Sequence, residues 1–278
     1  MNTRSSTIDW TGWIRRWDAQ QARYLPDREQ RFAIMLDALD VLVPQPFVAL
    51  DLACGPGSLS QRVLGRFPQA QTIAIDYNPV LLRLGQEALG TIDGRLHWIS
   101  ANLLQADWPD QITARLQQIG RTHVDVVLTT TALHYLPAPA LVDVYAQAAT
   151  LIRPGGVLLN GDHMAFAPSQ PTARQLAKES LRRQYERVFD RVGGEDYRGW
   201  WAAIEADLVA HDPALLSLFE QHRANEAQRR RDFSEPIVAV HEAALYDAGF
   251  VEVSTIWQTL DNRVLLAVRG QPTEPIHH

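Results

Sequence analysis

One stretch of the sequence, Val48–Leu59, constrains the fold more than any other. It begins as a short apolar run, which is typical of a buried parallel strand, and continues into a loop with two glycines. From Leu59 to Phe67 apolar residues recur at helical spacing. A strand, a glycine-rich turn and a helix in this order form a ligand-binding unit. Gly55 and Gly57 let a ligand approach the main chain, and the helix N-terminus offers free N–H groups.

Two acidic residues favour one of the two ligand classes that use such a turn, S-adenosylmethionine, over dinucleotides. Ser60 stands where the dinucleotide fingerprint has its third glycine, and Asp51 ends the strand just before the turn. An acid at this position repels a pyrophosphate but suits the ammonium group of a methionine moiety. Asp76 ends a second apolar strand, at the spacing of about 20 residues that is expected for an acid that binds ribose hydroxyls.

These residues resemble the motifs of the class I S-adenosylmethionine-dependent methyltransferases. Leu50–Gly57 resembles the first motif of that family and Ile75-Asp76 the second, with Ala53 in place of the usual first glycine. The resemblance extends over roughly 47–164 and 235–269, and its further motifs lie at 124–136, 151–156 and 248–250. It implies binding of S-adenosylmethionine and release of S-adenosylhomocysteine.

The resemblance also implies an α/β fold, with a seven-stranded, mostly parallel, doubly wound sheet of strand order 3-2-1-4-5-7-6 whose last strand is antiparallel. The sequence agrees with this, because strand-like and helix-like segments alternate after Phe47. Strands are expected near 47–52, 71–76, 95–100, 123–130, 155–162, 251–258 and 260–268. The expected domains are N-terminal lid helices at 1–46, a cofactor-binding core at 47–164 and 235–270, and a helical insertion at 165–234 that serves as a substrate lid.

The resemblance places the cofactor-binding residues at the carboxyl ends of the strands. Asp76 is expected to bind the ribose and Tyr77 to lie beside the adenine ring. Asn102 stands where the family usually has an Asp that contacts the adenine amino group, and its side-chain oxygen can accept the same hydrogen bond. Asp107 competes for this role, and a purely turn-forming role for Asn102 stays open. The full expected set is Asp51, Ala53, Gly55, Gly57, Asp76, Tyr77, Asn102, Leu103 and Thr130.

Two histidines are candidates for a catalytic base, because imidazole titrates near neutral pH. His134 follows the predicted strand at 123–130, and His163 follows the one at 155–162. Each could instead be a packing residue at the sheet edge. A base is needed for a hydroxyl or an acidic C–H acceptor, whereas an amine or a carboxylate needs much less help. An N-P-P-Y motif is absent, which disfavours methylation of adenine N6 or of glutamine.

The first helix carries an aromatic stripe and either packs on the core or closes over the cofactor. Two arginines follow it, Arg28 and Arg31. One of them could pair with the methionine carboxylate, but surface positions are expected, because arginine is mostly exposed. The stripe consists of Trp10, Trp13, Trp17 and Tyr24.

The segment at 165–234 breaks the alternation of strands and helices. It predicts helices at 172–191, 197–209 and 213–230 over the catalytic edge of the sheet. Its aromatic residues either line an apolar substrate pocket or hold the helices together. They are Tyr197, Trp200, Trp201 and Phe219.

Composition limits the partners. The net charge of −6 argues against nucleic acid, and the single cysteine, Cys54, fits a reducing cytoplasm. No apolar run reaches the roughly 20 residues of a membrane span. Asp207 and His211 lie four apart and His222 follows, but a metal-binding motif is missing, so no metal is expected.

The sequence therefore predicts a cytoplasmic methyltransferase for a small-molecule acceptor, a monomer or a homodimer, with O-, N- and C-methylation all open. Three other functions remain: a methyltransferase for RNA or protein, an NAD-dependent oxidoreductase, and a non-catalytic module that binds the cofactor.

Overall fold

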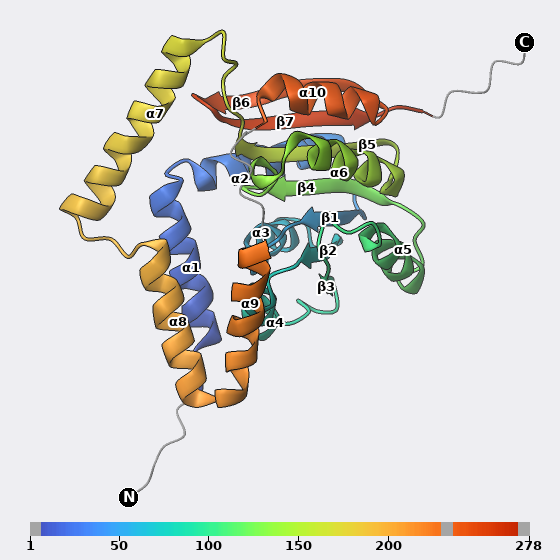
Figure 1. The fold of residues 1–278 in the computed structure, drawn as a ribbon. Coiled ribbons are helices and arrows are strands. Elements are labelled where there is room, and N and C mark those ends of the chain that lie inside the picture. Colours follow the sequence, from blue (N-terminus) through green and yellow to red (C-terminus); the bar gives the residue numbers. More distant parts are fainter. Residues whose placement is uncertain (1–6, 229–235, 272–278) are drawn as a thin grey trace, which may run out of the picture.

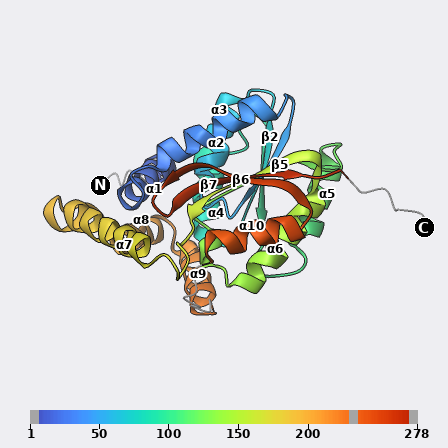
Figure 2. The same ribbon diagram turned by 90° about the horizontal axis from the view of Figure 1, so that it is seen from above.

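A seven-stranded sheet lies at the centre of the chain, with helices on both of its faces (Figures 1 and 2). The structure is a computed structural model and describes residues 7–228 and 236–271. The strand order is β3-β2-β1-β4-β5-β7-β6, and β7 runs antiparallel to both of its neighbours. The predicted fold class, including the strand order, is confirmed.

The strands lie close to their predicted positions. They are β1 (Val48–Leu52), β2 (Gln71–Asp76), β3 (Leu96–Ser100), β4 (Val124–Thr130), β5 (Ile152–His163), β6 (Phe250–Thr259) and β7 (Asn262–Arg269). The helices are α1 (Trp10–Tyr24), α2 (Arg28–Leu42), α3 (Ser58–Arg66), α4 (Pro79–Leu89), α5 (Trp108–Gln118), α6 (Ala138–Leu151), α7 (Pro171–Tyr185), α8 (Tyr197–His211), α9 (Leu216–Gln228) and α10 (Val238–Asp247).

Strand β5 begins earlier than predicted. Ile152 already pairs with Val124 of β4, and the register then shifts before Val157 pairs with Val126. The glycine-rich turn therefore forms the irregular first part of the strand. Gly155 takes a positive φ of 72° there, a conformation that glycine adopts without strain.

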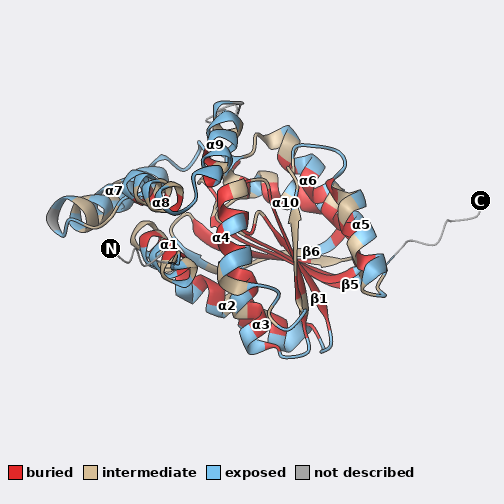
Figure 3. Ribbon diagram, turned by 90° about the horizontal axis from the view of Figure 1, so that it is seen from below, coloured by how far each residue is buried: buried red, intermediate tan, exposed pale blue. Residues whose placement is uncertain are grey.

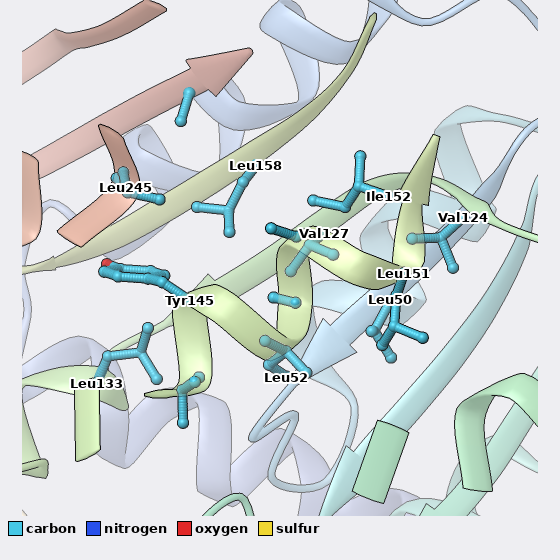
Figure 4. Close-up of a cluster of buried hydrophobic side chains, with 14 of the residues drawn as sticks. Leu50, Leu52, Val124, Val127, Leu133, Tyr145, Leu151, Ile152, Leu158 and Leu245 are labelled. Carbon is cyan, nitrogen blue, oxygen red and sulfur yellow. The ribbon is translucent and has the colours of Figure 1, made fainter. Parts of the chain in front are cut away.

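The sheet separates two apolar cores (Figure 3). Every residue of β1 is buried, as expected for a central parallel strand covered on both faces. Leu50 and Leu52 belong to the core under α5, α6 and α10, which Figure 4 shows around Tyr145. Ala49, which points to the opposite face, belongs to the core under α2 and α3.

A third apolar cluster joins the first of the predicted N-terminal lid helices to the predicted helical insertion. In it α1 and α8 meet α4 through Trp13, Trp17 and Trp200, and the Trp17 and Trp200 ring centroids are 4.9 Å apart. The first helix therefore packs on the insertion and on α4. The insertion begins and ends at one place, because Ala165 and Ile237 form a β-bridge.

The insertion is helical, as predicted, with two differences: the helix predicted at 213–230 begins as a 3₁₀ turn, Pro213–Leu215, before α9, and the helix predicted at 172–191 changes type. The predicted helix at 172–191 is α-helical only to Tyr185 and continues as a π-helical turn, Glu186–Arg191. In Figure 1, α7 projects from the rest of the fold. The last two residues of the helix predicted at 213–230 lie outside the described residues. None of the helices in the described ranges is long and apolar enough to span a membrane.

Candidate active site

The turn after β1 is built from residues in the left-handed backbone region. Ala53, Gly55 and Gly57 have φ values of 54°, 56° and 84°. A Cβ atom on Gly57 would also lie 2.6 Å from the ring of Trp98, so this position needs glycine for two reasons. Ala53 adopts a conformation that a Cβ atom disfavours, which explains why a glycine is the usual residue at this place.

Asp76 fastens this turn to the next element. Its Oδ2 atom accepts a hydrogen bond of 2.7 Å from the Gly55 N–H, and its Oδ1 atom accepts one of 2.8 Å from the Asn78 N–H. Burial raises the pKa of the carboxyl, and these backbone donors oppose the increase. Strands β1 and β2 are neighbours, as the assignment of Asp51 and Asp76 to one site requires.

Asp51 is fully buried and points toward the start of α3. Its Oδ2 atom accepts hydrogen bonds from the Ser60 N–H (3.1 Å) and from the Ser60 Oγ (2.7 Å). Its Oδ1 atom has no hydrogen-bond partner in the described part of the chain. Burial raises the pKa of Asp51 to about 7, the hydrogen bonds from Ser60 oppose this, and the nearby Asp76 raises it further.

The other predicted cofactor residues lie along the same edge. The Ala101 N–H donates to the carbonyl of Asp76 at 3.0 Å, so the loop with Asn102 and Leu103 starts beside β2. The Asn102 side-chain oxygen accepts a hydrogen bond of 3.0 Å from the Leu104 N–H, which is the turn-forming role. Leu103 borders a cavity of about 150 Å³ between this loop and α6. Thr130, at the end of β4, contacts an arginine described below.

The insertion reaches the loop after β2. The Tyr77 hydroxyl donates to Glu226 Oε1 of α9 at 2.8 Å, and Asn78 Nδ2 lies 3.1 Å from the ring nitrogen Nδ1 of His222. Trp201 stacks on His222, with ring centroids 4.2 Å apart. Helix α9 therefore covers the place where Tyr77 was expected to meet adenine.

His134 forms a short hydrogen bond with a residue that the sequence analysis did not single out. The Nδ1 atom of His134 lies 2.6 Å from Oδ1 of Asp162. The other carboxylate oxygen accepts the backbone N–H groups of Ala132 and His134, at 3.2 and 3.0 Å. Burial by itself raises the pKa of Asp162, but the attraction of His134 and of other nearby cationic groups outweighs it, and the pKa lies well below its usual range.

His163 lies beside this pair. The two imidazole centroids are 6.3 Å apart, and His163 Nδ1 is 3.5 Å from Oδ2 of Asp261. The structure thus brings both predicted bases together, each next to a carboxylate. Asp162 could have been found from the signal that marked Asp51 and Asp76, an acid at the end of an apolar strand.

The expectation that Arg28 and Arg31 lie on the surface is wrong. Only 5% of Arg28 and 0% of Arg31 is exposed, and Arg31 is covered where α2 packs on β5 and β7. Arg28 forms an ion pair of 2.8 Å with Asp18. Arg31 donates to Thr130 Oγ1 at 2.7 Å, to Asn262 Oδ1 at 3.0 Å and to Thr131 Oγ1.

Two aromatic residues of the insertion take the packing role that was one of the two expectations, and the pocket-lining role stays a prediction. Trp200 and Phe219 are buried in the third cluster and hold helices together, whereas 43% of Tyr197 is exposed. Asp207 accepts a hydrogen bond of 2.7 Å from Trp13 Nε1. Within the described ranges, no group of three or more His, Cys, Asp or Glu residues is placed to hold a metal ion.

Comparisons with known proteins agree with this geometry. A family model described as a methyltransferase domain matches residues 49–156. The chain is 28% identical over 244 residues to the trans-aconitate 2-methyltransferase of Azoarcus sp. (strain BH72), which covers 73% of this chain and 88% of that protein. It is 32% identical over 131 residues to the malonyl-[acyl-carrier protein] O-methyltransferase of Xylella fastidiosa (strain M23), covering 47% of this chain and 39% of that protein. A solved O-methyltransferase family protein from Burkholderia thailandensis shares the fold, with a TM-score of 0.53 and 19% identity over 97% of this chain and 66% of that one.

The matched segment runs from β1 into β5 and includes both the glycine turn and Asp76. The chain is a class I S-adenosylmethionine-dependent methyltransferase. The residues of this methyltransferase fit the cofactor. A buried carboxylate oxygen without a partner in the described residues, Oδ1 of Asp51, suits a cationic amino group, and Gly55, where only Leu81 lies within 4 Å of the place of a Cβ atom, suits close approach to the main chain.

Proposed function

We propose that this methyltransferase acts on an oxygen atom of a small-molecule acceptor held beside His134 and His163. S-adenosylmethionine supplies a methyl group on a positively charged sulfur, so the protein mainly has to align the acceptor and exclude water. The observation that carries the proposal is the 2.6 Å hydrogen bond between His134 Nδ1 and Asp162 Oδ1 at the carboxyl edge of the sheet.

His134 is the proposed base. With Nδ1 bound to Asp162, the ring orientation is fixed and Nε2 is the nitrogen left to accept a proton from an acceptor hydroxyl. The buried carboxylate of Asp162 stabilises the imidazolium that forms. His163 is the second candidate, and its Nδ1 contact with Asp261 is longer, at 3.5 Å.

The proposed cofactor site spans the ends of β1, β2, β3 and β4. Asp51 pairs with the amino group, Asp76 accepts the ribose hydroxyls, and the turn at Ala53, Gly55 and Gly57 lies against the methionine part. These assignments are supported by the buried carboxylates and by the turn geometry. The remaining members of the proposed set are Tyr77, Asn102, Leu103 and Thr130.

The names of the relatives support an oxygen acceptor. One relative is named for trans-aconitate and another for O-methylation of malonyl-acyl-carrier protein. Both names refer to acids, which favours a second candidate reaction, methylation of a carboxylate oxygen. A carboxylate is already a nucleophile, and this reaction would not need His134 as a base.

We further propose that the acceptor is a free metabolite and not a nucleic acid, and that the protein is a cytoplasmic monomer or homodimer. The net charge of −6 supports the first part, because phosphate binding needs a basic face. We also propose the three units that the sequence predicts: lid helices at 1–46, a cofactor-binding core at 47–164 and 235–270, and a substrate lid at 165–234.

Methyl transfer from labelled S-adenosylmethionine tests the function. The acceptors are trans-aconitate, a panel of small carboxylic acids and hydroxy acids, and bulk RNA and protein. Label in a small acid or hydroxy acid is the expected result, and label confined to RNA or protein would contradict the proposal. Within a positive result, His134→Gln separates the two reactions, because it slows transfer to a hydroxyl by roughly 100-fold or more and leaves transfer to a carboxylate nearly unchanged.

A further inference from the structure

Arg31 is a buried cation whose contacts are neutral. Its guanidinium is completely covered, and its hydrogen bonds go to the hydroxyls of Thr130 and Thr131 and to the side-chain oxygen of Asn262. Its Nε atom has no partner among the described residues. Within these ranges no acidic side chain forms an ion pair with it, whereas Arg28, one turn earlier on α2, has Asp18 at 2.8 Å.

Asp162, the acid that attracts Arg31 most strongly, forms no ion pair with it among the described contacts. Asp162 attracts the guanidinium and raises its pKa, but burial lowers the pKa more, to about 10. The oxygens of Asp162 are engaged by His134 Nδ1 and by backbone N–H groups, the N–H of His163 among them. Burying a charge without a direct partner is costly, so such a charge is usually kept for a purpose.

The surrounding backbone is shaped to hold this side chain. A Cβ atom on Gly161 of β5 would lie 2.9 Å from Arg31 Cδ, so the glycine lets the arginine cross the strand. Thr131, a β-branched residue, has a positive φ of 54° and contacts the guanidinium with its hydroxyl. Backbone strain of this kind gathers at ligand sites.

The guanidinium lies next to the two histidines. Asn262 pairs with His163 across β5 and β7, and the Thr131 N–H donates to the carbonyl of Gly161 at 3.0 Å, directly before Asp162. A ligand bound by the guanidinium would therefore lie near the proposed base, and β1, which leads into the cofactor turn, is the neighbour of β4.

We propose that Arg31 is the receptor for a carboxylate of the methyl acceptor, so that the substrates of this enzyme are small organic acids. This rests on the proposed function and specifies its substrate class. A guanidinium carries five N–H donors, of which the contacts above use three, and a carboxylate supplies the missing negative charge.

Calorimetry tests the proposal without relying on methyl transfer. Protein saturated with S-adenosylhomocysteine is titrated with trans-aconitate, citrate and malonate, and with their neutral methyl esters. The wild type is expected to bind at least one acid roughly tenfold or more tighter than its ester. Arg31→Gln should remove this preference and change the affinity for S-adenosylhomocysteine by less than about twofold.

Two further variants control for folding. Arg28→Gln removes the matched buried arginine and should keep the preference for acids. Arg31→Lys keeps the charge without the planar fork and should give an intermediate preference, which is informative if Arg31→Gln does not fold.

Three outcomes would overturn the proposal: no preference for acids in the wild type, an undiminished preference in Arg31→Gln, or a loss of S-adenosylhomocysteine affinity in its place. The last would assign Arg31 to the carboxylate of the cofactor. Acids that bind through Arg31 but receive no methyl group would count against the proposed function and not against this site.

Discussion

The hydroxyl of Ser60 donates a hydrogen bond of 2.7 Å to Oδ2 of Asp51, and this contact gives both residues a role in the turn. Ser60 stands where a dinucleotide-binding turn has its third glycine. In this chain its hydroxyl and its N–H hold a carboxylate that is fully buried under the start of α3. The residue that breaks the dinucleotide fingerprint is therefore the partner of the acid that favours a cationic ligand.

Binding of S-adenosylhomocysteine is expected to release a proton from Asp51. The pKa of this carboxyl is raised to about 7, so at pH 7 it is roughly half protonated in the free protein. A bound ammonium group favours the ionised form and lowers the pKa, and about 0.5 proton leaves at pH 7. Calorimetry in buffers of different ionisation enthalpy measures this number. Methylthioadenosine, which lacks the amino group, and the Asp51→Asn variant should release none, and zero release from the wild type would refute the assignment.

Asp76→Ala is expected to abolish cofactor binding while the fold survives. The variant removes the proposed ribose contacts and also the acceptor of the Gly55 N–H, so the turn loses its tie to β2. Two lost charge-assisted hydrogen bonds weaken S-adenosylhomocysteine binding by roughly 100-fold or more. Wild-type affinity in a variant with an unchanged circular dichroism spectrum would contradict the site.

Ala53→Gly is expected to stabilise the protein by about 1 kcal/mol, because residue 53 has a φ of 54° that a Cβ atom disfavours. Gly55→Ala and Gly57→Ala form a matched pair, since both positions have positive φ values but only at Gly57 would an added Cβ atom lie 2.6 Å from Trp98. The Gly57 variant should lose more stability. Thermal unfolding measures the order, and equal losses would argue against the close contact with Trp98.

His134→Gln is expected to make the folded protein less resistant to acid. The depressed pKa of Asp162 gives stability that is present above about pH 4 and is lost only as the pH falls through the lower native pKa. Without His134, burial raises the pKa of Asp162, so this stability disappears at a higher pH. Urea unfolding between pH 3 and 7 measures the effect, with His123→Gln, an exposed position near the start of β4, as the control. If the free energy of unfolding falls with pH in the same way for the wild type and for His134→Gln, then His134 does not lower the pKa of Asp162.

The sheet and the two acids at its edge were predictable from the sequence. Apolar runs mark β1 and β2, and a single acid lies at the end of each of them. The sequence alone could therefore place Asp51 and Asp76 at the ends of neighbouring strands. The contact between Asp51 and Ser60 could not be predicted from the sequence, because it depends on how α3 begins after the turn.

The arginines show where sequence reasoning fails. Arginine is mostly exposed, and that expectation outweighed the spacing of Arg31, which lies on one helical stripe with the apolar residues Met35 and Leu39. Its burial follows from the crossing of α2 over β5 at a glycine, Gly161, which lies 130 positions away in the chain. The end of an apolar strand could have marked Asp162 itself, but its hydrogen bond to His134 could not be predicted, because that bond joins the ends of two strands.

The hydrogen bonds that Tyr77 and Asn78 form with α9 link the lid to the loop that follows Asp76. A nucleoside seated at Asp76 therefore meets side chains that are already engaged by Glu226 and His222. If the nucleoside binds at Asp76 as proposed, cofactor exchange and the position of α9 are expected to be coupled through these two hydrogen bonds. In that case the insertion would affect how fast the product leaves, even though it contributes none of the proposed reacting groups.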